Sequence, residues 1–202
     1  QPGAEQQQAA QQTRTQETEK EKTEAEAQPA PQDIEVVENL VLENKDIRTV
    51  WTNKGAGLMR TVLKKYQASY TENGKRPELT LLKDFEEGRY SEVLEKVILA
   101  SEEGVSGGAT EELATAGLIY QVVEQQEDRL VFEATVGNRI RVRKTVTIPE
   151  EGYHVDVSYD FANVSDQRLT LQYYLRGPAG IAREVAATQY LGTRVGLKEG
   201  DE

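Results

Sequence analysis

Strict alternation of apolar and polar residues in the C-terminal half most constrains the fold. Apolar side chains lie on one face of each of three runs: Ile140, Val142, Val146 and Ile148; Tyr153, Val155, Val157, Tyr159 and Phe161; and Leu169, Leu171, Tyr173 and Leu175. The intervening positions are largely polar: Arg141, Arg143, Thr145 and Thr147, then His154, Asp156, Ser158 and Asp160. A period of two predicts strands with one buried face. Turn residues at 149–152 and 163–167 separate the runs, so we expect an antiparallel meander packed on one side.

Shorter runs upstream indicate further strands. Leu130, Phe132 and Ala134 alternate before Gly137-Asn138, which is typical of a tight hairpin turn. Ile119–Val123 adds another strand, and Ile47, Thr49 and Trp51 alternate near the start of the patterned region. With seven or more strands, the sequence favours a mainly β domain in which sheet packs on sheet, an antiparallel β-sandwich with little helix.

Three segments between these strands have other patterns. Residues 58–66 carry apolar residues at helical spacing, but they follow a glycine-rich turn, so we expect a strand. Val93, Leu94, Val97 and Ile98 are also spaced as on a helix, with Ser91 as a potential N-cap, and we predict a short helix over Ser91–Leu99. Residues 101–112 are rich in Gly, Ser and Glu, which is typical of a surface loop.

Residues 1–33 contain mainly Gln, Glu, Thr and Ala and have no apolar side chain larger than Ala. Such a composition cannot offset the entropy cost of ordering, so we expect a disordered linker. It is either a spacer that holds a domain away from an anchor or a terminus with no task. We therefore divide the chain into a linker (1–33), a β-sandwich domain (34–195) and a polar tail (196–202). Because it starts at Gln1, we expect a fragment or a processed product.

Charge and composition exclude several classes of function. The net charge of −11 argues against binding to nucleic acid or to an anionic membrane, since both are polyanions. Without cysteine, the chain can form no disulfide, no thiolate zinc site and no cysteine nucleophile. No apolar run approaches the ~18 residues that span a bilayer.

No catalytic, cofactor-binding or metal-ligating residue is predicted. His154, the single histidine, lies on the polar face of its expected strand, and we interpret it as an exposed side chain. Gly55 and Gly57 lack the Gly-Lys-Ser/Thr of a phosphate loop and fit a hairpin turn. The adjacent acid pairs lack the alternate spacing of a calcium loop. They are Glu86-Glu87, Glu102-Glu103, Glu111-Glu112 and Glu150-Glu151. The sequence therefore predicts a protein that is not an enzyme.

Aromatic residues leave one alternative open. The set comprises Trp51, Tyr66, Tyr120, Tyr153, Tyr159, Tyr173 and Tyr174. These side chains could line a groove, as in a carbohydrate-binding or mutarotase-like β-sandwich module, although aromatic side chains more often pack in cores and at edges.

Two stretches resemble the periplasmic domain of the YidC membrane protein insertase family. The first contains Leu42-Glu43-Asn44, Ile47, Thr52-Asn53-Lys54-Gly55-Ala56 and Leu63-Lys64-Lys65-Tyr66. The second contains Lys144, Val146, Ile148, Tyr153, Val155, Val157, Tyr159, Phe161, Asn163 and Ser165, followed by Leu175–Ile181 with its Gly-Pro step. The resemblance covers Leu40–Tyr66 and Leu118–Ile181.

The resemblance implies a twisted, galactose-mutarotase-like supersandwich on the periplasmic face of the inner membrane. Residues 1–33 would tether it to that membrane. It also implies an interaction module in membrane protein insertion and folding, with Sec translocon accessory proteins or nascent membrane proteins as partners. Insertion in this family is carried by a transmembrane core that this chain lacks, so the resemblance assigns insertase chemistry to no residue here.

Overall fold

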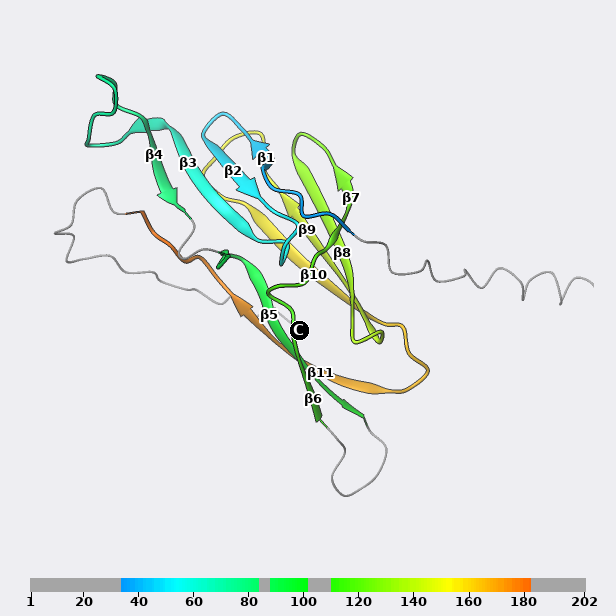
Figure 1. Ribbon diagram of the computed structural model, residues 1–202. Helices are drawn as coiled ribbons and strands as arrows, with labels where there is room; N and C mark the ends of the chain where they lie inside the picture. The colour runs from blue at the N-terminus through cyan, green and yellow to red at the C-terminus, as the bar shows by residue number, and fades with distance from the viewer. Residues whose placement is uncertain (1–33, 84–87, 102–109, 183–202) are drawn as a thin grey trace, which may run out of the picture. The chain divides into compact units, whose positions relative to one another are not determined.

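A computed structural model describes residues 34–83, 88–101 and 110–182, and this part of the chain is built from strands without an α-helix. The strands form three antiparallel sheets (Figure 1). The prediction of a mainly β, sandwich-type fold is therefore confirmed. The expected linker (1–33) and tail (196–202) lie outside the described residues.

The first sheet has the order β1-β2-β3-β4. Its strands are β1 (Leu40–Glu43), β2 (Ile47–Trp51), β3 (Leu58–Gln67) and β4 (Glu78–Leu82). The expected strand over 58–66 is confirmed as β3. The glycine-rich segment 53–57 turns the chain between β2 and β3, as predicted, and Gly55 and Ala56 both have positive φ there.

The second sheet has the order β10-β9-β8-β7. Its strands are β7 (Gln121–Gln125), β8 (Arg129–Val136), β9 (Ile140–Thr147) and β10 (Asp156–Asn163). Gly137 and Asn138 both have positive φ between β8 and β9, as a tight hairpin turn requires. The predicted faces hold: Val142 and Val146 of β9 are buried, whereas Arg141 and Arg143 are exposed.

The third sheet places β11 beside β5, which corrects the expected meander. Its order is β11-β5-β6, with β5 (Val93–Ser101), β6 (Thr110–Ala114) and β11 (Leu169–Arg176). β9 and β10 pair as expected, but β11 then pairs with β5 instead of β10 (Figure 1). An alternating pattern defines the faces of a strand and not its partner, so a strand can switch sheets at a sandwich edge.

The predicted helix over Ser91–Leu99 is wrong, because this segment forms β5. Its pairing with β11 shifts register where Tyr174 faces Lys96 and Leu175 faces Leu94, so Glu95 is an extra, bulged residue. Because of the bulge, apolar residues occur next to each other and four positions apart, as they do along one face of a helix. Ser91, the expected N-cap, instead accepts the Ala179 N–H and donates its hydroxyl to Ala179 O.

Two boundaries also differ from expectation. The predicted loop over 101–112 gives way to β6 from Thr110 onward, while residues 102–109 lie outside the described part. Tyr153 was expected to face the core but precedes β10 and is 51% exposed. His154 also lies before the strand and is exposed, in agreement with its interpretation as a surface residue.

The hydrophobic core joins side chains from all three sheets. Fully enclosed members include Leu42, Trp51, Leu94, Val97, Tyr120, Leu130, Phe132, Val142 and Val146. The inward residues Val155, Val157, Tyr159 and Phe161 pack against this cluster but are only partly buried. The polar residues that alternate with them, Asp156, Ser158 and Asp160, are exposed. The predicted inward and outward faces of β10 are therefore confirmed from Val155 onward.

Candidate functional site

Asn44 ties the β1–β2 turn to the loop before β10. Its Oδ1 accepts the backbone N–H groups of Asp46 and Ile47, both at 2.8 Å. Its Nδ2 donates to Pro149 O at 2.9 Å and to Gly152 O at 3.1 Å. All four hydrogen-bonding positions of the amide are thus occupied, and the side chain links the first sheet to the second.

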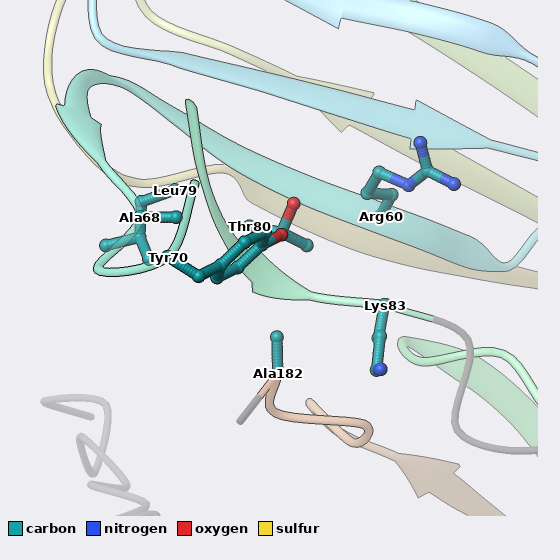
Figure 2. Close-up of a pocket in the computed structure, with 7 residues that line it drawn as sticks. All are labelled: Arg60, Ala68, Tyr70, Leu79, Thr80, Lys83 and Ala182. Atoms are coloured by element: carbon teal, nitrogen blue, oxygen red, sulfur yellow. The ribbon is translucent and has the colours of Figure 1, made fainter. Parts of the chain in front are cut away.

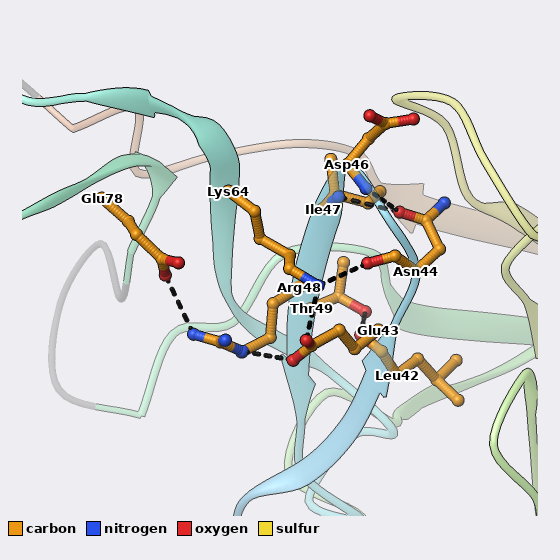
Figure 3. Close-up of polar contacts among 9 residues, drawn as sticks. All are labelled: Leu42, Glu43, Asn44, Asp46, Ile47, Arg48, Thr49, Lys64 and Glu78. Atoms are coloured by element: carbon orange, nitrogen blue, oxygen red, sulfur yellow. Dashed lines mark hydrogen bonds and ion pairs between the residues drawn. The ribbon is translucent and has the colours of Figure 1, made fainter.

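Glu43 centres a charge network on the outer side of the first sheet (Figure 3). It accepts from Arg48 Nε at 2.5 Å and from Lys64 Nζ at 2.6 Å. Arg48 also pairs with Glu78 at 3.0 Å, which carries the network from β1 to β4. Hydrogen bonds from Arg48 and Lys64 lower the pKa of the Glu43 carboxyl, so the network stays charged at neutral pH.

Replacing Asn44 by Ala is expected to cost about 2–3 kcal/mol of unfolding free energy. The change leaves two N–H groups and two carbonyls without their side-chain partner in a largely buried turn. The control is Asn163→Ala, because Asn163 makes a similar local set of hydrogen bonds in an exposed turn. Urea unfolding should show a loss of about 1 kcal/mol or less for the control. Equal losses would mean that Asn44 does not link the sheets.

Asn53 plays a comparable role at the β2–β3 turn. Its Oδ1 accepts the Val37 N–H at 2.7 Å, and its Nδ2 donates to Glu35 O at 2.9 Å and Tyr120 O at 3.1 Å. The side chain therefore fixes the segment before β1 and the start of β7 against the turn. Asn44 and Asn53 lie in the motifs quoted above, and both hold loops together.

Lys144 is a feature that the sequence analysis missed. It is fully enclosed on the inward face of β9, where its Nζ donates to Ala56 O at 2.7 Å and to Glu92 O. The ammonium also lies 4.9 Å from the Trp51 ring centroid and 5.2 Å from that of Tyr159. Two carbonyl oxygens and two aromatic faces therefore surround one buried cation. The sequence does hold a sign of this burial, because Lys144 shares the inward face of its strand with Val142 and Val146.

Burial is the main cause of the shifted pKa values in this cluster. Desolvation lowers the pKa of Lys144 to about 7, and the neighbouring Glu92 carboxylate opposes that shift. Burial also raises the pKa of Glu92, although Lys144 counteracts it. Because its ammonium group is enclosed, Lys144 cannot reach a substrate from solvent, and its geometry is that of a tie between the β2–β3 turn and β5.

An open hollow of about 220 Å³ lies beside β4 and is the candidate binding site (Figure 2). It is lined by Arg60, Ala68, Tyr70, Leu79, Thr80, Lys83 and Ala182. The Tyr70 ring extends toward Thr80, while Arg60 comes from β3 and Lys83 follows β4 (Figure 2). Among the described residues, the lining contains two cations and no acid, so the hollow suits an anionic group.

The chain crosses from the third sheet to the margin of this hollow. After β11, Ala182 N donates to Leu81 O at 2.9 Å, and Lys83 N donates to Gly180 O at 3.0 Å. These bonds fix residues 180–182 along the end of β4. Sequence reasoning could not find the hollow, because its lining comes from β3, the β3–β4 connection, β4 and residue 182.

The structure separates the aromatic residues that the sequence grouped. Trp51 and Tyr120 are fully enclosed, so neither can present a stacking face to a sugar. Tyr66 and Tyr153 contact each other edge to face, with ring centroids 6.0 Å apart. Tyr173 stacks on Phe161 at 5.0 Å, at a different place in the fold. The single groove that the alternative hypothesis needs is therefore not assembled from these seven side chains.

The acid pairs within the described ranges lie at the surface. Glu111 and Glu112 pair with Arg139 and Lys96, and Glu150 pairs with Lys45. Residues 86–87 and 102–103 lie outside the described part. Across 34–83, 88–101 and 110–182, no group of three or more His, Cys, Asp or Glu residues could hold a metal ion. The same residues include no helix long and apolar enough to cross a membrane.

Comparison with known proteins identifies the family. The searches of curated proteins and of solved structures gave no match. A family model described as the YidC periplasmic domain matches residues 39–195, which includes the segment 67–117 that the sequence resemblance did not cover. The match confirms the expected resemblance and spans most of the chain. The chain therefore belongs to the YidC periplasmic domain family.

Proposed function

We propose that this domain is a non-catalytic interaction module of a membrane protein insertase, on the periplasmic face of the inner membrane. Membership of the YidC periplasmic domain family carries the proposal, since it associates the chain with an insertase and an extracytoplasmic location. The motif residues support it. Asn44 and Asn53 hold loops together and Lys144 is enclosed, so these polar side chains serve the fold.

An exposed apolar run on β11 is the surface that we propose for the partner. Tyr173, Tyr174 and Leu175 are each about half exposed. Among the described strands, β11 is the last of its sheet, so one side of its backbone has no paired strand there and suits pairing with a partner. An extended segment can add to such an edge through main-chain hydrogen bonds while its side chains contact the apolar run. An emerging segment of a membrane protein has this chemistry.

Site-specific photo-crosslinking in the insertase that contains this domain tests the proposal. A photoreactive residue at Tyr174 should form adducts with nascent membrane proteins. The same residue at Gln121, an exposed polar position on β7, should form few or none. Adducts with Sec accessory proteins at Tyr174 would assign the surface to those proteins instead. Equal labelling at both positions, or none at Tyr174, would contradict a partner site on β11.

A further inference from the structure

The hairpin formed by β3 and β4 carries a net positive charge, whereas the whole chain is negatively charged. Between Arg60 and Lys83 the sequence has six Lys and Arg residues and two Glu residues, although the whole chain has a net charge of −11. The net charge opposes contact between the whole chain and an anionic surface, but it does not describe this segment. Local sign decides which face an anionic partner can approach, because screening limits charge interactions to about 10 Å.

Four of the six hairpin cations have no ion-pair partner among the described residues. Lys64 pairs with Glu43, and Lys65 pairs with Asp46. The remaining four are Arg60, Lys75, Arg76 and Lys83, for which the described part holds no acid within ion-pair distance. Cations elsewhere in the fold, such as Lys45, Lys96 and Arg139, do have acidic partners. Within the described part of the chain, these four positive charges are therefore not neutralised by an acid.

The connection between β3 and β4 projects from the sheet. Asn73 and Gly74 have φ of 50° and 78°, as a tight turn requires, and Glu72 and Lys75 bridge across it. A Cβ added at Gly74 would meet nothing within 4 Å, so the tip is surrounded by open space. Lys75 and Arg76 follow this tip directly. Tyr70 and Leu81, 49% and 43% exposed, supply apolar surface near the base.

We propose that this basic hairpin, defined by Arg60, Tyr70, Lys75, Arg76 and Lys83, binds the phosphate groups of anionic lipid headgroups. The proposal rests on the proposed function, which puts the domain beside a membrane. Flexible Lys and Arg side chains and an exposed tyrosine are the groups that proteins use at a lipid–water interface. The hollow between Arg60 and Lys83, whose described lining holds no acid, has room for a phosphate with its glycerol but is small for a folded partner.

Vesicle co-sedimentation at low salt tests this inference on the 202-residue chain. The probes are vesicles of phosphatidylcholine alone and vesicles in which 40 parts in 100 are phosphatidylglycerol. We expect binding only to the anionic vesicles, and we expect it to fall as salt is added. Each Lys or Arg near such a surface contributes about a fivefold increase in partitioning. The triple variant Lys75→Gln, Arg76→Gln, Lys83→Gln should therefore bind about 100-fold more weakly.

The matched control removes three other cations: Lys54→Gln, Arg141→Gln and Arg143→Gln. It makes the same change in net charge outside the hairpin, so vesicle binding should stay within about twofold of the parent. Circular dichroism checks that both triple variants are folded.

An equal loss of vesicle binding in the two variants, or no binding to anionic vesicles by the parent chain, would overturn the proposal. Binding of poly-glutamate without vesicle binding would assign the hairpin to acidic peptides and also overturn it. Because the vesicles contain no protein, these outcomes are independent of the crosslinking test on β11.

Discussion

Gly55→Ala is expected to reduce the unfolding free energy by about 3 kcal/mol. Gly55 has a φ of +65°, where an L-residue is strained by about 1 kcal/mol. An added Cβ would also lie 2.5 Å from Ala116 O, a backbone atom that cannot rotate away. Overpacking of this kind adds about 1–3 kcal/mol. The turn cannot easily shift, because Gly55 N donates to Leu118 O at 2.7 Å.

The matched control is Gly74→Ala, which isolates the backbone strain. Gly74 has a similar φ of +78°, but its added Cβ would meet nothing within 4 Å. Urea unfolding should therefore show a loss of only about 1 kcal/mol for this variant, with an unchanged slope. A Gly55→Ala midpoint equal to that of Gly74→Ala would show that the β2–β3 turn relaxes away from Ala116.

Alternation of side chains predicted the strands and their faces, because only local geometry is needed for that inference. Val142, Val146 and Val157 lie in the predicted phase, and Gly137-Asn138 forms the predicted turn. The same pattern contains no information on which strand lies alongside. The prediction for β11 therefore had the right secondary structure but the wrong neighbouring strand. Five residues separate β10 from β11, which is enough for the chain to pass from one sheet to another.

β5 shows where the periodicity itself fails. A strand with a bulge at Glu95 has a broken period of two, and Val93, Leu94 and Val97 then match a helix as well as a strand. Long-range pairing with β11 and β6 decides the outcome. Secondary structure at this segment is set by tertiary contacts, which a window of nine residues cannot contain.

The candidate sites depend on residues that are distant in the sequence. Lys144 meets Ala56 and Glu92, which precede it by 88 and 52 positions, so its carbonyl partners cannot be inferred from its neighbours. The hollow likewise combines Arg60 with Ala182. By contrast, the family motifs could be recognised from sequence, since they include turn residues such as Asn44 and Gly55 whose identity is fixed by local backbone geometry.

The stability of the domain is expected to rise with pH between about 7 and 9.5 because of Lys144. Burial holds its folded-state pKa at about 7, below the ordinary value of 10.5. Between these values the unfolded chain binds one proton more than the folded chain, so raising the pH favours folding. Each pH unit contributes about 1.4 kcal/mol, and the rise should reach about 3 kcal/mol. Below pH 7 both states hold the proton and this dependence vanishes.

Lys144→Met tests whether the rise belongs to this residue. Two other titratable groups lie near the ammonium: the Glu92 carboxyl, which interacts with it electrostatically, and Tyr159, whose ring centroid is 5.2 Å from Nζ. Burial raises the pKa of Glu92, and this carboxyl contributes stability that is lost as pH rises through its folded-state pKa. Burial also raises the pKa of Tyr159 above its usual value, so tyrosine ionisation in the unfolded chain opposes folding only near pH 10.

Urea unfolding from pH 6 to 9.5 should show an unfolding free energy that rises with pH for the parent and for Lys83→Met, which removes an exposed lysine. The profile of Lys144→Met should lack that rise, and it should be less stable than the parent at pH 9.5 by several kcal/mol, because two buried carbonyls lose their donor. An unchanged rise in Lys144→Met would show that the two carbonyls, the two rings and Glu92 keep Lys144 charged throughout this range.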